Sequence, residues 1–132
     1  MKPKAILFLI LLFTIISCTS EIDVAKCIDS GLPMTLKINT EKNGLTETKT
    51  KIIEPQSEKF KKFIVWCNSN SSGWKNAIAS YNTNMLVTQN NFRLLYFGNA
   101  VVIGFYDEYG KPKQYSKSVK RGELDFLFKD YK

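Results

Sequence analysis

The chain has 132 residues, enough for one domain and too few for two. Apolar residues make up 44% of it and charged residues 23%, so the chain can bury a core and is not disordered by composition. Nineteen Lys and Arg against twelve Asp and Glu give a net charge of +7, and no histidine is present. Catalytic triads and zinc sites that need an imidazole are therefore excluded.

Residues 1–17 have the pattern of an export signal. Lys2 and Lys4 accompany a stretch from Ala5 to Ile16 that is apolar except for Thr14. Such a stretch suffices for the apolar region of a signal peptide but is too short to span a bilayer, which takes about 20 apolar residues. We therefore expect residues 1–17 to be a cleaved signal peptide and not a transmembrane anchor.

The end of this stretch indicates the type of signal. Ile15-Ile16-Ser17-Cys18 resembles the lipobox of bacterial lipoproteins, in which a cysteine follows two permissive residues and a small one. The resemblance implies that Cys18 carries the lipid, palmitate included, and becomes the first residue of a membrane-anchored chain. Thr19 stands where an aspartate would favour retention in the inner membrane, so we expect the outer membrane, facing the periplasm. The alternative is an ordinary secretory signal cut near Ser20.

Two further cysteines remain in what would be an oxidising compartment. With Cys18 assigned to lipid, we predict a disulfide between Cys27 and Cys67. It would close a loop of about 40 residues and contribute about 3–4 kcal/mol to stability in the chain-entropy model. The alternative is that both are buried free thiols.

The mature chain begins with a polar segment and a hairpin. We expect residues 18–30 to be a lipidated tether and residues 31–132 to form the domain. Alternating residues predict strands over 34–40 and 46–53, and Asn43-Gly44 between them is a strong signal for a two-residue hairpin turn.

A helix follows the hairpin. Pro55 ends the second strand, and Ser57 is placed to cap the helix. Apolar residues follow at the helical spacing i, i+3, i+4 and i+7: Phe60, Phe63, Ile64 and Cys67. This spacing predicts that Cys67 lies on the buried face.

The remaining strands have the spacing of a meander. Short turns separate strands expected at residues 85–89, 92–97, 100–106 and 111–119, so the sheet should be antiparallel. The run at 100–106 is apolar on both faces, which indicates a central strand with the helix on one side and the first hairpin as the candidate for the other.

The C-terminal segment, residues 123–131, fits both a helix and a strand, and we favour the helix because it starts after Gly122 and ends in lysines. The predicted fold is α+β: one small domain with a twisted antiparallel sheet of about six strands, a hairpin plus a meander, packed on one main helix.

Catalytic motifs are weak. Ser72-Gly73-Trp74-Lys75 matches the S-x-x-K motif of penicillin-binding proteins and β-lactamases, but the companion S-D-N and K-T-G motifs are missing. The acidic pairs Asp107-Glu108 and Glu123-Asp125 are expected in a turn and a first helical turn, which explains both without catalysis. We therefore predict no catalytic residues, no metal site and no cofactor.

Two surfaces are candidates for binding a partner. Lys111, Lys113, Tyr115 and Lys117 alternate along one strand, which places them on one face. The alternative is that these lysines protect an edge strand from pairing with other chains. Most aromatic residues should pack in the core, but Trp74 and Tyr81 lie between the helix and the meander, where an exposed pair would suit a protein partner.

These features favour a membrane-anchored envelope lipoprotein that acts as a non-catalytic binding or inhibitory module. In architecture only, it resembles the small periplasmic immunity lipoproteins that block secreted toxins. The alternative is a structural or assembly lipoprotein that contacts peptidoglycan or an outer-membrane complex. We expect the membrane, through Cys18, and an envelope protein as partners, and no nucleic acid, because an exported protein seldom meets it. The sequence leaves the oligomeric state open.

Overall fold

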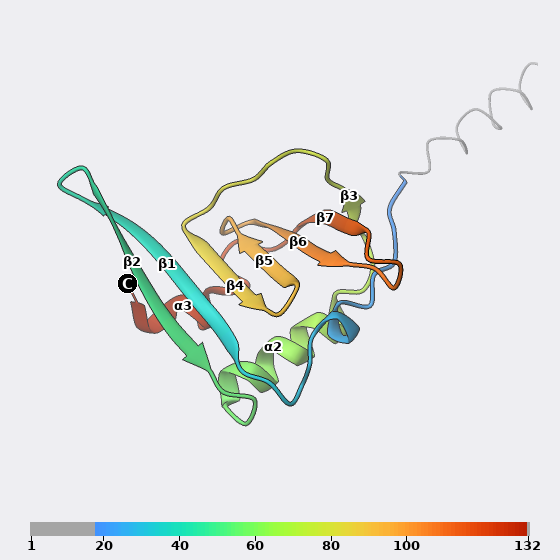
Figure 1. Cartoon of the computed structure of the whole chain (residues 1–132), viewed down its shortest axis with the longest axis horizontal. Coiled ribbons are helices and arrows are strands. Elements are labelled where there is room, and N and C mark those ends of the chain that lie inside the picture. Colours follow the sequence, from blue (N-terminus) through green and yellow to red (C-terminus); the bar gives the residue numbers. More distant parts are fainter. Residues whose placement is uncertain (1–17, 132) are drawn as a thin grey trace, which may run out of the picture.

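The structure is a computed structural model that describes residues 18–131, so the predicted signal peptide, with the first three lipobox residues, lies outside the described residues. The chain forms one small α+β domain around a seven-stranded antiparallel sheet (Figure 1). The elements in chain order are η1 (Val24–Cys27), β1 (Met34–Lys42), β2 (Leu45–Ile53), α2 (Glu58–Ser69), β3 (Lys75–Asn76), β4 (Met85–Gln89), β5 (Phe92–Tyr96), β6 (Ala100–Tyr106), β7 (Pro112–Ser118), α3 (Asp125–Phe128) and η2 (Lys129–Tyr131).

The α+β class is confirmed, but the expected strand count of about six is wrong. The sheet has the order β2-β1-β4-β5-β6-β7-β3, and the strand that the sequence did not indicate is β3. It pairs Lys75 with Ser116 and Asn76 with Tyr115. Two residues are too few to show the alternation by which strands are recognised in sequence.

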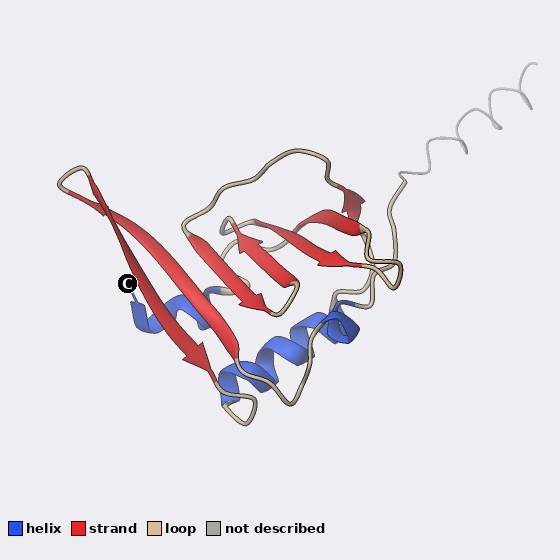
Figure 2. Cartoon of the chain, in the orientation of Figure 1, coloured by secondary structure: helices blue, strands red, loops and turns tan. Residues whose placement is uncertain are grey.

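The first hairpin belongs to the same sheet and does not cover its other side. Asn43 and Gly44 have φ values of 53° and 75°, as a two-residue hairpin turn requires. β1 then pairs with β4 only over residues 35–38, so the outer half of the hairpin extends beyond the other strands (Figure 1). The helices are gathered on one side of the sheet, and the long loop between β3 and β4 passes on the other (Figure 2).

The helix α2 forms as its sequence predicts. The Ser57 hydroxyl accepts a hydrogen bond from the Phe60 amide at 3.2 Å, which caps the first turn. Phe63 and Cys67 are buried against the sheet, while Ile64 is half-buried. The predicted burial of Cys67 is thus confirmed.

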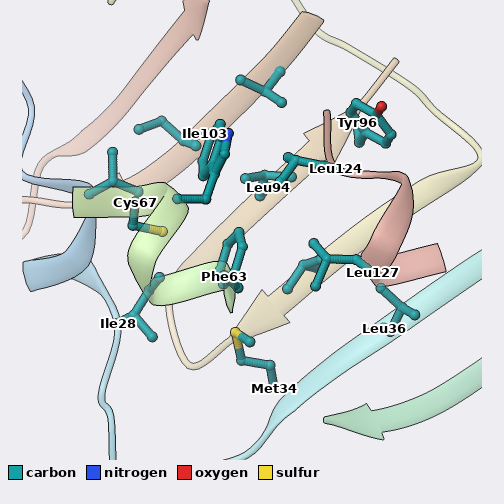
Figure 3. Close-up of a cluster of buried hydrophobic side chains, with 14 of the residues drawn as sticks. Ile28, Met34, Leu36, Phe63, Cys67, Leu94, Tyr96, Ile103, Leu124 and Leu127 are labelled. Carbon is teal, nitrogen blue, oxygen red and sulfur yellow. The ribbon is translucent and has the colours of Figure 1, made fainter. Parts of the chain in front are cut away.

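The core lies between the sheet and the helices (Figure 3). β1 contributes Met34 and Leu36, and β5 contributes Leu94 and Tyr96. The C-terminal segment closes this core as a short helix, as favoured, with Leu124, Leu127 and Phe128 fully buried. The Tyr96 ring stacks on Phe128 with centroids 5.7 Å apart, and its hydroxyl donates to Asp125 at 3.0 Å.

Residues 18–30 are not the free tether that the sequence suggested. Ser20 and Trp74 exchange backbone hydrogen bonds of 2.6 and 3.3 Å, and the Ile22 amide donates to Ser71 at 2.7 Å. Val24 is fully buried and Ile28 is 7% exposed. The domain therefore begins at Ser20, because apolar residues that look isolated in the sequence fill the core beside α2.

The two tryptophans give a matched test of this core. The Trp74 indole N–H donates to the Asn70 carbonyl at 2.7 Å, whereas the buried Trp66 indole N–H has no hydrogen-bond partner among the described residues. We expect Trp74→Phe to lower the free energy of unfolding by about 1–3 kcal/mol, because it removes a hydrogen bond and leaves a cavity.

Trp66→Phe leaves a similar cavity but removes an unsatisfied donor, so its free energy of unfolding should fall less than that of Trp74→Phe, by about 1 kcal/mol or more. Urea unfolding followed by far-ultraviolet circular dichroism measures both. Equal losses in the two variants would contradict this assignment.

Candidate binding surface

Cys18 is exposed and lies two residues before Ser20, which forms an isolated β-bridge with Trp74, the residue just before β3. Two extended residues reach at most about 7 Å. A lipid on the Cys18 sulfur would therefore hold the domain close to the membrane surface, with the β3 edge of the sheet next to the anchor. A long flexible linker is not present after this residue.

The predicted basic strand face exists, but its side chains are engaged. Lys113, Tyr115 and Lys117 lie opposite Phe105, Ile103 and Val101 of β6, which places them on the helix side of the sheet. Tyr115 stacks on Phe105 with centroids 6.0 Å apart. Lys113 lies 3.8 Å from the Asp107 carboxylate.

Lys117 is half-buried beside the fully buried Trp74. Its Nζ donates to the Ser72 carbonyl at 2.7 Å and lies 5.8 Å from the centroid of the Trp74 ring. Desolvation lowers the pKa of Lys117, and the nearby Glu123 carboxylate partly opposes this shift. These contacts give Lys117 a packing role, and its predicted part in a partner-binding basic patch stays a prediction.

Lys111 lies just before β7, in the turn that closes the β6–β7 hairpin. The Asp107 carboxylate accepts the backbone amides of Lys111 at 2.8 Å and Tyr109 at 2.9 Å. The amide of Lys111 is the main cause of the lowered pKa of Asp107, opposed in part by desolvation and supported by the Tyr109 amide and by the charges of Lys113 and Lys111. Asp107 thus has the turn role that the sequence suggested.

The alternative explanation for the lysines, protection of an edge strand, is wrong. β3 pairs with β7, and the Ala77 amide continues this contact by donating to the Gln114 carbonyl at 3.0 Å. The edges of the sheet are β2 and β3.

The predicted aromatic pair is split by the fold. Trp74 is fully buried, which overturns its assignment to the surface. Tyr81 is 40% exposed, and its ring meets Phe97 edge to face at a centroid distance of 6.2 Å. Tyr81 therefore remains available to a partner, in the loop that follows β3.

The side of the sheet away from the helices carries a site that the sequence did not reveal. Arg93 on β5 lies directly opposite Gly104 on β6, and Gly104 lies opposite Gln114 on β7. A Cβ atom at position 104 would come within 2.7 Å of Arg93 Nε, so glycine allows the arginine to lie flat across β6. Arg93 Nη2 then donates to Gln114 Oε1 at 2.9 Å.

Gln114 also fixes the loop that borders this site. Its Nε2 donates to the carbonyl oxygens of Ala77 at 3.0 Å and Ala79 at 2.8 Å. The side-chain amide of Gln114 therefore contacts both the Arg93 guanidinium and the loop. Its oxygen and its nitrogen each have a hydrogen-bond partner. In sequence, Arg93, Gly104 and Gln114 are too far apart to suggest this contact, and only the register of three strands brings them together.

An open groove of about 690 Å³ lies between this loop and the sheet. Its polar lining includes Arg93, Lys113, Gln114, Tyr81 and Ser80, with no carboxylate. Ile78, in the same loop, is completely exposed. The groove thus combines the Arg93 guanidinium with an accessible apolar residue and a tyrosine, a combination that suits an acidic surface of another protein.

The S-x-x-K residues do not form a nucleophile site. Trp74 is buried between Ser72 and Lys75, Ser72 precedes β3 in a loop, and Lys75 is the first residue of β3. These residues are not helical, since Ser72 lies at a bend and Gly73 has a φ of 80°, so they lack the one-turn helical spacing by which the motif brings serine and lysine together. Within residues 18–131, no group of three or more His, Cys, Asp or Glu side chains is placed to hold a metal ion.

No helix in the described part of the chain is long and apolar enough to cross a membrane. Comparisons with models of known protein families, with curated proteins and with solved structures found no match. The site must therefore be interpreted from its own geometry.

Cys27 and Cys67 lie in elements that pack on each other, η1 and α2, and both take part in the same core. In the structure both are thiols, Cys27 half-buried and Cys67 buried. Burial is the main cause of the raised pKa of each thiol; Asp23 adds to the shift of Cys27, and the proximity of Cys27 adds to that of Cys67. The disulfide between them stays a prediction.

We expect this bond to form when the chain is exported. Each thiol would lose one hydrogen, and the two electrons would pass to the disulfide of a thiol oxidoreductase. Alkylation of the denatured, unreduced protein followed by mass spectrometry should then label neither Cys27 nor Cys67, and reduction should lower the free energy of unfolding by about 3–4 kcal/mol.

The double variant Cys27→Ser, Cys67→Ser is the control, and its stability should not respond to the reductant. Quantitative labelling of both cysteines without reductant would contradict the prediction.

Proposed function

We propose that this protein is a lipid-anchored binding module of the bacterial cell envelope, which acts by occupying a partner protein and not by turnover. Within this class, the version we favour is an immunity protein that blocks a secreted toxin. The groove beside Arg93 is the main support for the proposed binding role. The lipobox-like sequence that ends at Cys18 supports the proposed location in the cell envelope.

The short distance between Cys18 and the folded domain supports an anchored role. Because Ser20 is already bridged to Trp74 of the folded domain, a lipid on Cys18 would confine the domain to a layer near the membrane. Confinement raises the effective concentration of a binding site toward any partner that reaches the same surface. Two or three acyl chains would exceed what stable anchoring requires.

The charge of the groove supports an acidic partner. Arg93 has Gln114 as its hydrogen-bond acceptor, and no described carboxylate forms an ion pair with it. Its guanidinium is planar and held in place, so it can donate two parallel hydrogen bonds to a carboxylate, the bidentate geometry that arginine favours. A mature chain without Lys2 and Lys4 would carry a net charge of +5, which would also steer an acidic protein toward it.

The anchor is tested on the full chain expressed in a bacterium. We expect a mature protein that begins at Cys18, carries diacylglycerol and fractionates with membranes. The variant Cys18→Ala should not be lipidated, and its signal peptide should not be cleaved. Intact mass and detergent-phase partitioning measure this. A native product that is water-soluble, or that keeps residues 1–17, would contradict the anchor.

The binding face is tested with the two arginines of the chain. An acidic exported protein encoded beside this one should bind the domain, and Arg93→Glu should weaken that binding by about tenfold or more, because it places a carboxylate in the acid-free groove. Arg121→Glu makes the same charge change at an exposed position outside the groove and should alter binding little.

Isothermal titration at two salt concentrations measures both variants. If Arg93→Glu binds as the parent does, the groove is not the interface. If no neighbouring exported protein binds, the immunity version fails, and a defect in envelope integrity on deletion would favour a structural role.

A further inference from the structure

The outermost strand β2 has an unusually open edge. It pairs with β1 on one side only, and all of its nine residues except Ile53 are exposed. Leu45 is 74% exposed and Ile52 is 55% exposed. A long regular edge without proline presents unpaired amide and carbonyl groups to any strand that can align with them.

The hairpin turn determines which backbone groups face outward. In a two-residue hairpin, the residues that flank the turn, here Lys42 and Leu45, exchange backbone hydrogen bonds, and such pairs alternate along the ladder. Residues 45, 47, 49 and 51 therefore direct their amides toward β1. Residues 46, 48, 50 and 52 direct theirs away from the sheet.

We propose that β2 pairs antiparallel with β2 of a second copy of this chain, centred on Thr48, to form a symmetric dimer with a continuous sheet. In this register Thr48 faces Thr48 of the other copy, and Thr46 faces Thr50. These are the residues with outward-facing amides, so each pair exchanges backbone hydrogen bonds. Threonine pairs are also favourable neighbours across strands.

The same register matches the charges. Glu47 of each copy lies opposite Lys49 of the other, on the helix side of the sheet. This is a pair without direct backbone bonds, where side chains approach most closely. Twofold symmetry produces the ion pair twice. Lys51 lies opposite Leu45, so its alkyl stem covers a leucine that is 74% exposed in the single chain.

Adjacent registers are worse. Centring the pairing one residue earlier places Glu47 against Glu47, and centring it one residue later places Lys49 against Lys49. Like charges directly opposite one another are destabilising. Lysines on an edge strand usually discourage pairing. Here Glu47, two residues before Lys49, can pair with the lysine of a second copy, so the charges favour one alignment over the others.

The resulting interface is one strand wide, so we expect a weak and reversible dimer. Full chains with two different C-terminal tags are co-expressed and purified through one tag. Differently tagged wild-type copies should co-purify. Two differently tagged Glu47→Lys copies should not co-purify, and neither should two Lys49→Glu copies. Sedimentation equilibrium of residues 19–132, which contain all seven strands and every described core residue, should show dimer dissociation constants raised roughly tenfold or more in both single variants.

The mixture of the two variants is the decisive sample. Glu47→Lys copies and Lys49→Glu copies restore two opposite-charge pairs when they meet, so they should co-purify with each other although neither associates with itself. The double variant E47K/K49E should also recover self-association. Glu108→Lys and Lys62→Glu, which change exposed charges on the β6–β7 turn and on α2, should leave the dimer intact.

The proposal is overturned if wild-type copies do not associate, if the single variants associate as well as the wild type, or if the mixture does not recover. Unchanged circular dichroism and melting temperature exclude unfolding as the reason for a loss. A loss of binding to an acidic partner in these variants, without wild-type self-association, would instead assign β2 to that partner and overturn the dimer. The dimer does not depend on the proposed function, because the test needs no partner.

Discussion

Trp74 joins the segments on which the rest of the structure depends. Its backbone pairs with Ser20, its indole donates to the Asn70 carbonyl at the end of α2, and its ring lies under the Lys117 ammonium. Burying one indole therefore fixes the start of the domain, the exit of the main helix and the last long strand at the same point. The same packing brings residues 20–28 against the domain and leaves Lys117 half-buried within the basic strand face.

The two sides of the sheet are stabilised in different ways. The helix side is a continuous apolar core, in which close packing determines where each side chain lies. The other side has no helix over it, and its loop is held by hydrogen bonds to Gln114. A surface held by polar contacts stays accessible to water, and so the side chains available to a partner lie here rather than on the helix side.

Local patterns in the sequence predict the elements whose stabilisation is local. The Asn43-Gly44 turn, the Ser57 cap and the apolar spacing of α2 depend on residues within one or two turns of each other, and each was predicted close to its observed position. The C-terminal segment was ambiguous, and the helix is favoured by burial of Leu124, Leu127 and Phe128, a condition set by the distant sheet.

The candidate site was less predictable because it depends on register. Alternation correctly placed Lys113, Tyr115 and Lys117 on one face, but it could not tell which face the helix would cover. Trp74 was a candidate for the surface because it lies between the helix and the meander, but it is buried beside partners as distant in sequence as Ser20 and Lys117. Arg93, Gly104 and Gln114 carry no local signal, since each is ordinary in its own strand and only their alignment across three strands creates the groove.

The order of the strands separates the roles that we propose. β3, beside the segment that leads to Cys18, and β2, with the open edge, lie at opposite ends of the sheet. The groove at Arg93 lies between them, so a lipid anchor, a partner in the groove and a second copy on β2 do not compete for the same residues. Pairing through β2 would also place the two anchors at the far ends of one continuous sheet. Two attachments release from a membrane far more slowly than one, because both must leave before the protein does. An edge interaction too weak to persist in dilute solution would therefore gain strength from the anchors, and would in turn strengthen the anchoring.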